Sequence, residues 1–561
     1  MYKILRRGTG RTFVLCGVVI SLLLCIYYVS QAQTPPPGPV NVLNEGLRYD
    51  RSLTPESPAP SDYPDAKVST DNCPVIAPSK TDVDTQEVFN KFEFQPSWMR
   101  SREYWDDSFE QRYAQLKKDE HRLPLKVIVV PHSHADPGWL KTFEQYFHSS
   151  TRGILNNMVT KLQQWPNMTF IWSEVSFLSL WWDSAHPTKK RAVKKLVKEG
   201  RLEMTTGGWV MTDEATSHIY GMLDQLIEGH QWLKTNLGVA PESGWAVDPF
   251  GHGATVPYLL KSSGISGTVI QRIHYAWKQW FAKHQYGDFH WRQPWDHTGS
   301  TDLLTHNQPF DIYSIKHSCG PHPHICLNFD FRKINGEYNE YTVRTVEVTK
   351  KNVKQIAELL LEQYARTGSL FPHNVVLMPL GDDFRYDHPI EWDQQYTNYK
   401  ALMDFINERK EEYNAEVVFG TPRDYFREIE TRRQQYPTLK GDFFVYSDIF
   451  SEGRPAYWSG YFTTRPYMKI LDRELEANLR SAEILYTVAL NVAKQSAQDI
   501  KLFETYFEKI VRARRNLGLF QHHDAITGTS KSVVMKDYAL KLFESLSDMT
   551  SLQSFVIQSL A

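Results

Sequence analysis

The chain has 561 residues, of which 41% are hydrophobic and 23% charged, and its formal net charge is −2. This composition is typical of a folded protein of three or four units at roughly 150 residues each, and the balanced charge argues against a general nucleic-acid-binding protein. Five cysteines are too few for a disulfide-stapled scaffold, so the 16 Trp, 29 Tyr and 29 Phe must fill large cores or line a site.

The first predicted element is an apolar run at residues 13–29, which follows the cations Lys3, Arg6, Arg7 and Arg11. Seventeen residues are at the short end of what spans a bilayer, and the positive flank is expected to stay cytoplasmic. We therefore predict a cytoplasmic tail (1–12), a signal-anchor transmembrane helix (13–29) and a lumenal remainder. A cleaved signal peptide is the alternative.

Residues 30–80 are predicted to form an extended stem, because ten prolines fall between positions 35 and 78. A lumenal location permits a glycan on Asn167 in the sequence Asn-Met-Thr, and favours a disulfide between Cys319 and Cys326 over two free thiols. Cys73 in the stem is left over, so it is a candidate for linking two chains into a homodimer.

Short apolar runs follow at residues 126–130, 168–172, 201–206, 267–270 and 374–378, and helical patterns separate them. Such alternation predicts an α/β layer of parallel strands, either a barrel or an open sheet, which we place at 81–435. In both architectures the chemistry lies at the carboxyl ends of the strands. Polar motifs that directly follow a strand are therefore the best candidates for a site.

The last part of the chain, 436–561, is predicted to contain a linker and a three-helix bundle. Apolar residues recur at spacings of three and four over 471–496, 499–517 and 530–560, and no proline interrupts these segments.

Four polar motifs stand out. PHSHADPGW (131–139) places His134 and Asp136 two residues apart after a strand, and imidazole with carboxylate suits zinc. ESGWAVDPFGHG contains Asp248, LMPLGDDFRY contains Asp383, and FQHHDAITGT contains His523. Each motif alone is also compatible with a polar turn or a helix cap.

Their joint occurrence beside aromatic residues favours an active site. Two carboxylates match the requirements of glycosidic bond cleavage, and a metal ion can add to this by holding sugar oxygens. The sequence contains no HExxH, P-loop or GxSxG motif, which argues against the common zinc proteases, phosphate-binding enzymes and serine hydrolases.

Six blocks, in this order, closely resemble the signature blocks of the class II α-mannosidases, glycoside hydrolase family 38: HSHADPGW, GGWVMTDEATSH, GWAVDPFGHG, VIQRIHY, PLGDDFRY and QHHDAITGT. The resemblance runs from about residue 122 to 560. It implies a barrel-like (β/α) catalytic domain and a three-helix bundle, followed in the family by a β-rich C-terminal region that this sequence lacks. Ala135 replaces the asparagine more common in the family, with a small expected effect on hydrogen bonding and no loss of metal.

The resemblance also implies roles for individual residues. One zinc ion per chain would be bound by His134, Asp136, Asp248 and His523. Asp248 would be the nucleophile and Asp383 the general acid/base of a retaining mechanism, so the pKa of Asp383 should be raised. Two further histidines, His132 and His522, would orient these ligands. Contacts to the sugar would come from Trp139, Phe250, Arg272, Tyr313 and Asp524.

By this resemblance the substrate is a hybrid N-glycan, from which α1,3- and α1,6-linked mannose is removed. The anchor and stem resemble those of the Golgi members of the family, which predicts a single-pass type II Golgi membrane protein. Two alternatives stay open. One is a catalytically weak or inactive anchored form that binds glycans or a partner enzyme, and the other is a zinc polysaccharide deacetylase on a similar barrel.

Overall fold

The computed structural model describes residues 79–92, 102–119, 121–334, 336, 342–432, 434–449, 455–496 and 500–560. The predicted tail and anchor, Cys73 and nearly all of the predicted stem lie outside these residues. In the part of the chain that is described, no helix is long and apolar enough to cross a membrane. Residues 76–561 form one compact unit.

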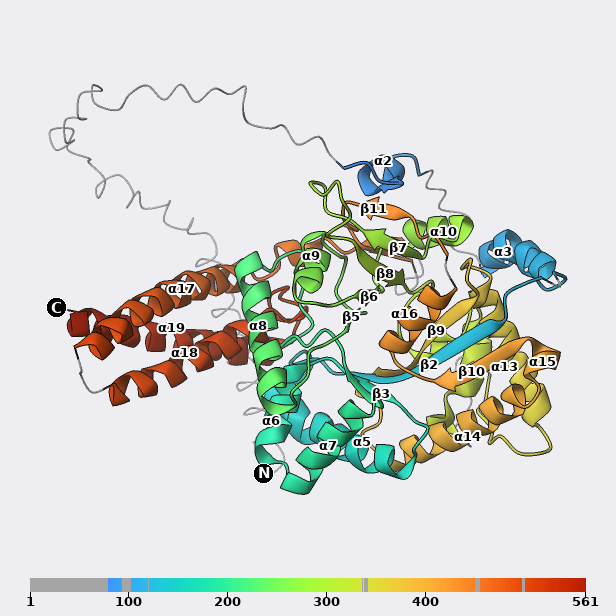
Figure 1. The fold of residues 1–561 in the computed structure, drawn as a ribbon, viewed down its shortest axis with the longest axis horizontal. Coiled ribbons are helices and arrows are strands. Elements are labelled where there is room, and N and C mark those ends of the chain that lie inside the picture. Colours follow the sequence, from blue (N-terminus) through green and yellow to red (C-terminus); the bar gives the residue numbers. More distant parts are fainter. Residues whose placement is uncertain are drawn as a thin grey trace, which may run out of the picture. The chain divides into compact units, whose positions relative to one another are not determined.

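Strands and helices alternate through the first part of this unit, and long helices follow (Figure 1). The strands are β1 (Val83–Asp84), β2 (Leu125–His134), β3 (Phe170–Trp172), β4 (Leu202–Met204), β5 (Ser243–Ala246), β6 (Gly267–Ile270), β7 (Asp288–Trp291), β8 (Leu303–Asn307), β9 (Val375–Asp383), β10 (Ala415–Phe419), β11 (Thr438–Lys440), β12 (Ser447–Asp448) and β13 (Ala456–Tyr457). The helices are α2 (Thr85–Phe89), α3 (Arg102–Leu116), α4 (Phe143–Tyr146), α5 (Arg152–Gln164), α6 (Val175–Ser184), α7 (Pro187–Lys198), α8 (Ile219–Asn236), α9 (Thr255–Ser262), α10 (Tyr275–His284), α11 (Ile315–Ser318), α12 (Pro323–Cys326), α13 (Val353–Gly368), α14 (Pro389–Asn407), α15 (Lys410–Tyr413), α16 (Pro422–Thr431), α17 (Pro466–Gln495), α18 (Lys501–Phe520) and α19 (Ser532–Leu560).

Parallel pairing dominates the strand layer, which confirms the predicted α/β class. β2 lies between β10 and β9, and β3 pairs with β4. A larger sheet has the order β1-β11-β7-β8-β6-β5 and is parallel except between β7 and β8. The five apolar runs predicted as strands correspond to β2, β3, β4, β6 and β9.

β2 explains why a continuous apolar run forms a strand here. Val127 and Val129 pack into one core cluster, while Ile128 and Val130 pack into another on the opposite face. A strand buried on both faces is the pattern expected in a parallel sheet that helices cover. The fixed register against β9 places His134 beside Asp383 at the carboxyl ends of both strands.

The predicted three-helix bundle is present as α17, α18 and α19, drawn in orange and red in Figure 1. Its inward residues, such as Leu475, Leu517 and Leu542, belong to the same apolar cluster as Phe170 and Trp172 of β3. The bundle therefore shares an apolar core with β3 and β4, while β2 and the larger sheet pack into other clusters. This packing holds the turn between α18 and α19, which carries His523, against the strand ends.

Two smaller expectations concern the surface loops. The disulfide between Cys319 and Cys326 is present and closes the loop that connects α11 to α12. Asn167 is exposed, and the Thr169 hydroxyl of the same acceptor sequence donates to the carbonyl of Gly420 at 2.7 Å. Glycosylation of Asn167 stays a prediction.

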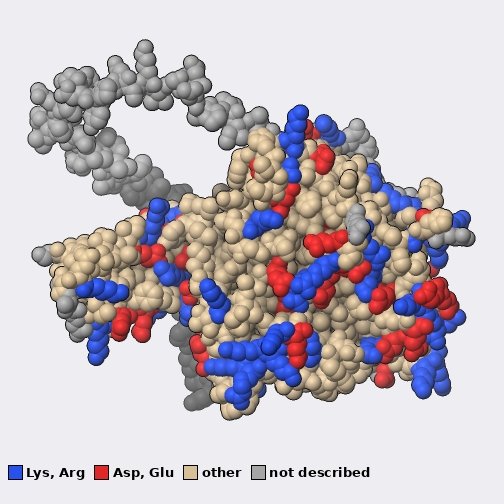
Figure 2. All heavy atoms as spheres, viewed as in Figure 1, with Lys and Arg blue, Asp and Glu red and all other residues tan. Residues whose placement is uncertain are grey.

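Side chains of both charges are spread over the face drawn in Figure 2, with a dense basic group over α7. In this helix Lys190 and Lys194 lie over the ring of Trp182, and Lys195 pairs with Glu199 at 3.6 Å. α7 packs inward through Val193 and Leu196 and presents its cations to solvent.

A buried polar network joins β7 and β8 to the start of β9. The Asp288 carboxylate lies 3.0 Å from a ring nitrogen of His306 and 3.0 Å from one of His373, and it accepts a hydrogen bond from the Tyr425 hydroxyl. Burial opposes ionisation of Asp288, but the two histidines hold its pKa below the usual range. The ionised carboxylate is therefore part of the folded structure.

We expect Asp288→Asn to lower the free energy of unfolding by about 3 kcal/mol, because it leaves buried partners of the carboxylate without their counter-charge. Urea unfolding followed by tryptophan fluorescence measures this. The matched control is Asp404→Asn, which breaks an exposed pair with Lys400 and should cost less than about 0.5 kcal/mol. An equal loss of unfolding free energy in the two variants would show that the buried network stabilises the fold no more than an exposed ion pair does.

Candidate metal centre and active site

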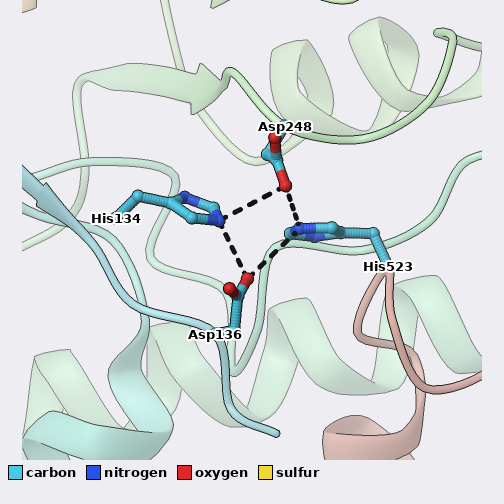
Figure 3. A group of neighbouring side chains, drawn as sticks. All are labelled: His134, Asp136, Asp248 and His523. Carbon is cyan, nitrogen blue, oxygen red and sulfur yellow. Dashed lines mark hydrogen bonds and ion pairs between the residues drawn. The ribbon is translucent and has the colours of Figure 1, made fainter. Parts of the chain in front are cut away.

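Four side chains from distant parts of the sequence converge on one point: His134, Asp136, Asp248 and His523 (Figure 3). All four are buried, and their ligand atoms lie within 4.8 Å of one another. His134 Nε2 is 2.9 Å from Asp136 Oδ1 and 3.5 Å from Asp248 Oδ2. His523 Nε2 is 2.9 Å from Asp248 Oδ2 and 3.4 Å from Asp136 Oδ1.

The strand layer explains this convergence. His134 is the last residue of β2, and Asp136 follows it by two positions; Asp248 lies in the loop after β5. The residues that follow the carboxyl ends of β2 and β5 lie close together. The turn between α18 and α19 adds His523 to them (Figure 3). Ala135, between the first two ligands, is fully buried in the apolar core.

The ring orientation of His523 is fixed by the backbone. Its Nδ1 donates to the carbonyl of Met211 at 2.8 Å, which leaves Nε2 facing the two carboxylates. Met211 belongs to the GGWVMTDEATSH block, whose role the sequence did not reveal. A backbone acceptor on the far nitrogen is a common way of fixing a metal-binding histidine.

Asp248 is held in its ionised form. Burial opposes the negative charge, but Arg272 and His134 hold the pKa of this carboxyl well below its usual range. Arg272, in the loop after β6, donates to Asp248 Oδ1 from Nε at 2.9 Å and from Nη2 at 2.6 Å. The second carboxylate oxygen of Asp248 stays directed at His134 and His523.

Asp383 has the opposite electrostatic character. Its carboxyl is reached by solvent but is surrounded by protein on most sides, and this partial desolvation raises its pKa to about 7. The nearby carboxylates of Asp136 and Asp248 act in the same direction. The Tyr313 hydroxyl donates to Asp383 Oδ1 at 2.6 Å, which favours the ionised form and limits the shift. The direction agrees with the expectation for a group that must carry a proton.

Three aromatic side chains lie near the Arg272 guanidinium. Phe250 lies 5.6 Å from the guanidinium carbon, and its ring is 5.7 Å from that of His523. The rings of Tyr446 and Trp458 lie 5.8 Å and 5.0 Å from the same carbon. Tyr446 and Trp458 come from a segment in which no motif marked them, so sequence reasoning missed both.

The remaining predicted residues lie around this centre with different degrees of contact. The Tyr313 ring is 4.9 Å from that of His134. Asp524 Oδ2 is 4.0 Å from His523 Nε2, and Oδ1 accepts from the Thr529 hydroxyl at 2.7 Å. Trp139 is half-buried and packs against the large core. A sugar contact of Trp139 remains a prediction.

The two neighbouring histidines are also close. His132 Nε2 lies 3.3 Å from the Tyr313 carbonyl, and His522 Nε2 lies 3.5 Å from both Asp136 Oδ1 and Asp524 Oδ2. Asp136, His522, His523 and Asp524 thus form a second set whose ligand atoms lie within 4.8 Å of one another. It shares Asp136 and His523 with the first set, so the two sets describe overlapping positions.

The first set can hold a divalent cation, and its ligand types are those of zinc. Tetrahedral zinc with nitrogen and oxygen ligands at about 2.0–2.1 Å requires neighbouring ligand atoms to lie about 3.3 Å apart. Four of the six distances between ligand atoms, from 2.9 to 3.5 Å, bracket this value, and the other two are no longer than 4.8 Å. Arg272 already pairs with Asp248, and a divalent cation would supply the further positive charge that two adjacent buried carboxylates need.

Comparison with known proteins supports a family assignment. Residues 124–449 match the family model described as the glycosyl hydrolases family 38 N-terminal domain. Residues 456–560 match the model described as the alpha mannosidase middle domain.

Individual relatives give the same picture. The chain is 60% identical over 497 residues to alpha-mannosidase 2 of Spodoptera frugiperda, covering 87% of this chain and 44% of the relative. It is 49% identical over 452 residues to human alpha-mannosidase 2, covering 79% of this chain and 39% of the relative. The chain thus spans about two fifths of the length of these relatives.

Among solved structures, an alpha-mannosidase from Enterococcus faecalis V583 matches with a TM-score of 0.56. The match covers 78% of this chain and 42% of that chain, at 17% sequence identity. At this identity the likeness concerns the fold alone.

Proposed function

Because the chain belongs to glycosyl hydrolase family 38, we propose that it is a retaining, zinc-dependent α-mannosidase. The observation that supports this best is the opposite electrostatic setting of two carboxyl groups at neighbouring strand ends. Asp248 is held ionised by Arg272 within the metal cluster, whereas the pKa of Asp383 is raised to about 7, so that Asp383 carries a proton below that pH. A retaining glycosidase needs this pair of an ionised nucleophile and a protonated acid.

A zinc ion held by His134, Asp136, Asp248 and His523 would supply Lewis-acid stabilisation and hold sugar hydroxyl oxygens when bound. The protein residues carry out the bond changes. Asp383 donates its proton to the leaving glycosidic oxygen, while Asp248 attacks the anomeric carbon and forms a covalent mannosyl ester. Asp383, now ionised, then takes a proton from water as the water displaces Asp248, and the anomeric configuration is retained.

The pH dependence follows from Asp383. The first step requires its proton, so activity should fall as the pH rises through its pKa of about 7. Tyr313→Phe removes the hydrogen bond that favours the ionised form. We expect this variant to move the alkaline limb of kcat/KM upward by about half a pH unit or more. A rate profile measured from pH 5 to 9 tests this, and an unchanged or lowered alkaline limb would contradict it.

The substrate proposal is a hybrid N-glycan, from which α1,3- and α1,6-linked mannose is removed. We also propose a Golgi lumenal location behind an anchor at residues 13–29 and a stem at 30–80. The charge pattern of the N-terminal sequence supports the orientation. The disulfide between Cys319 and Cys326 supports an oxidising compartment.

A panel of aryl glycosides tests the activity. The purified chain should hydrolyse aryl α-mannoside in preference to aryl α-glucoside and aryl β-mannoside. Release of acetate from an acetylated polysaccharide, without mannoside cleavage, would identify a deacetylase instead. Glycan binding without hydrolysis by zinc-loaded protein would identify an inactive glycan-binding form.

A further inference from the structure

Several buried polar atoms around the metal cluster have no hydrogen-bond partner within the described part of the chain, and two of them belong to residues at strand ends. One is His134 Nδ1, the ring nitrogen that points away from the cluster, and the other is Glu174 Oε2. Only 2% of the surface of Glu174 and 3% of that of His134 are exposed. A buried donor or acceptor without a partner costs about 1–3 kcal/mol, so each atom calls for an explanation.

The two metal-binding histidines differ in this respect. His523 directs Nε2 at the carboxylates and donates from Nδ1 to the Met211 carbonyl at 2.8 Å. His134 also directs Nε2 at the carboxylates, 2.9 Å from Asp136. Metal-binding histidines almost always donate their second ring N–H to a carboxylate, a backbone carbonyl or water, and this fixes the tautomer that binds the ion. Among the described residues, His134 Nδ1 has no acceptor that corresponds to the Met211 carbonyl beside His523.

Glu174 is the candidate for this acceptor. It follows β3 and immediately precedes α6, so it lies at the carboxyl end of a strand, as His134 does on β2. Its backbone is already fixed, since its carbonyl accepts from Trp172 Nε1 at 2.8 Å. The side chain forms no cap hydrogen bond with α6, which is the usual task of a polar residue at this position.

The electrostatics agree with this placement. Burial raises the pKa of Glu174 to about 7, and His134 is the neighbour that most strongly favours its ionised form. Glu174 belongs to neither of the two groups of candidate metal ligands. Its carboxylate is thus a buried acceptor near the cluster and lies outside both sets of ligands.

We propose that Glu174 is a positioning residue for the metal centre: its carboxylate accepts the Nδ1–H of His134 through one bridging water and keeps Nε2 free to bind the ion. The inference rests on the proposed zinc site, and it adds a residue outside the ligand set and outside the two carboxyls of the mechanism.

Zinc affinity is the measurement that isolates this role. The dissociation constant is obtained by competition with a chelating dye at fixed pH, using the purified chain. We expect Glu174→Met, which keeps the length of the side chain but cannot accept the hydrogen bond, to bind zinc about 10- to 100-fold more weakly. Glu174→Gln retains a neutral acceptor, so its zinc affinity should lie between those of the wild type and of Glu174→Met, about 3- to 10-fold weaker than wild type.

Glu203→Gln is the matched control, because Glu203 is also a buried carboxylate but is held by the Ser243 hydroxyl on β5. It should leave zinc affinity within about twofold of wild type, since it does not contact a ligand. The metal-free Glu174→Met protein should unfold at or somewhat below the wild-type temperature, because the buried Nδ1–H of His134 loses its acceptor.

The outcomes separate the two proposals. Wild-type zinc affinity in both Glu174 variants would overturn the positioning role and leave the zinc site intact. If Glu174→Met does not fold, the affinity of Glu174→Gln decides, and a wild-type value there overturns the proposal. A wild-type chain that binds no zinc would instead refute the metal centre itself, and the role of Glu174 with it.

Discussion

Asp248→Ala is expected to abolish hydrolysis of an aryl α-mannoside, with kcat reduced by roughly four orders of magnitude or more. The substitution removes the nucleophile and one of the four metal ligands at once. The fold should survive, because Arg272 keeps its aromatic surroundings of Phe250, Tyr446 and Trp458 after its carboxylate partner is lost. Steady-state kinetics and circular dichroism of the same preparation measure both effects.

The matched control is Asp302→Ala. Asp302 pairs with Arg292 through two hydrogen bonds of 2.7 Å, much as Asp248 pairs with Arg272, but it lies just before the amino end of β8. Because the site lies at the carboxyl ends of the strands, this control should change kcat by no more than about twofold. Near-normal hydrolysis by the Asp248 variant would refute its assignment as nucleophile.

Removal of the metal is expected to have an effect of similar size. Dialysis against a chelator should lower both the zinc content and kcat in parallel, to below about 1% of the starting rate, and added zinc should restore both. The reason lies in the four buried ligands, since Asp136 and Asp248 lose the cation that compensates their charges. Elemental analysis beside the mannoside assay gives both quantities, and one ion per chain is expected in the active protein.

Two controls make the chelation result specific. The same chelator saturated with zinc beforehand should leave the rate unchanged. His523→Ala, which removes a single ligand, should lower zinc content and rate together. A protein that keeps its full rate after its zinc has been removed would show that the cluster is not part of the active site.

Much of the strand layer could be predicted from the sequence because its strands are buried on both faces. In the run at 126–130, every residue after Lys126 is apolar. β2 and β9 each begin in such a run and extend into the motifs that carry His134 and Asp383. The strand-end rule then grouped these residues correctly with Asp248. The meeting of His134, Asp136, Asp248 and His523 was expected from the family resemblance, and the structure brings the four together.

Other features had no local signal. β7 and β8 are short strands that mix polar and apolar residues, so no clear strand pattern marks them in the sequence. In the structure they pair antiparallel, and the Asp288 carboxylate of β7 contacts His306 of β8. Trp458 reaches Arg272 from beyond the predicted strand layer. Glu174 immediately precedes a helix, where a glutamate is ordinarily exposed to solvent, and only the fold buries it near the cluster of His134 and Asp136.

The stereochemistry of the first product tests the central claim most directly. Proton nuclear magnetic resonance can follow hydrolysis of an aryl α-mannoside by the zinc-loaded chain before mutarotation mixes the anomers. Double displacement through Asp248 predicts that α-mannose appears first, with β-mannose rising only later. Initial formation of β-mannose would contradict the covalent role of Asp248 and the account built on it.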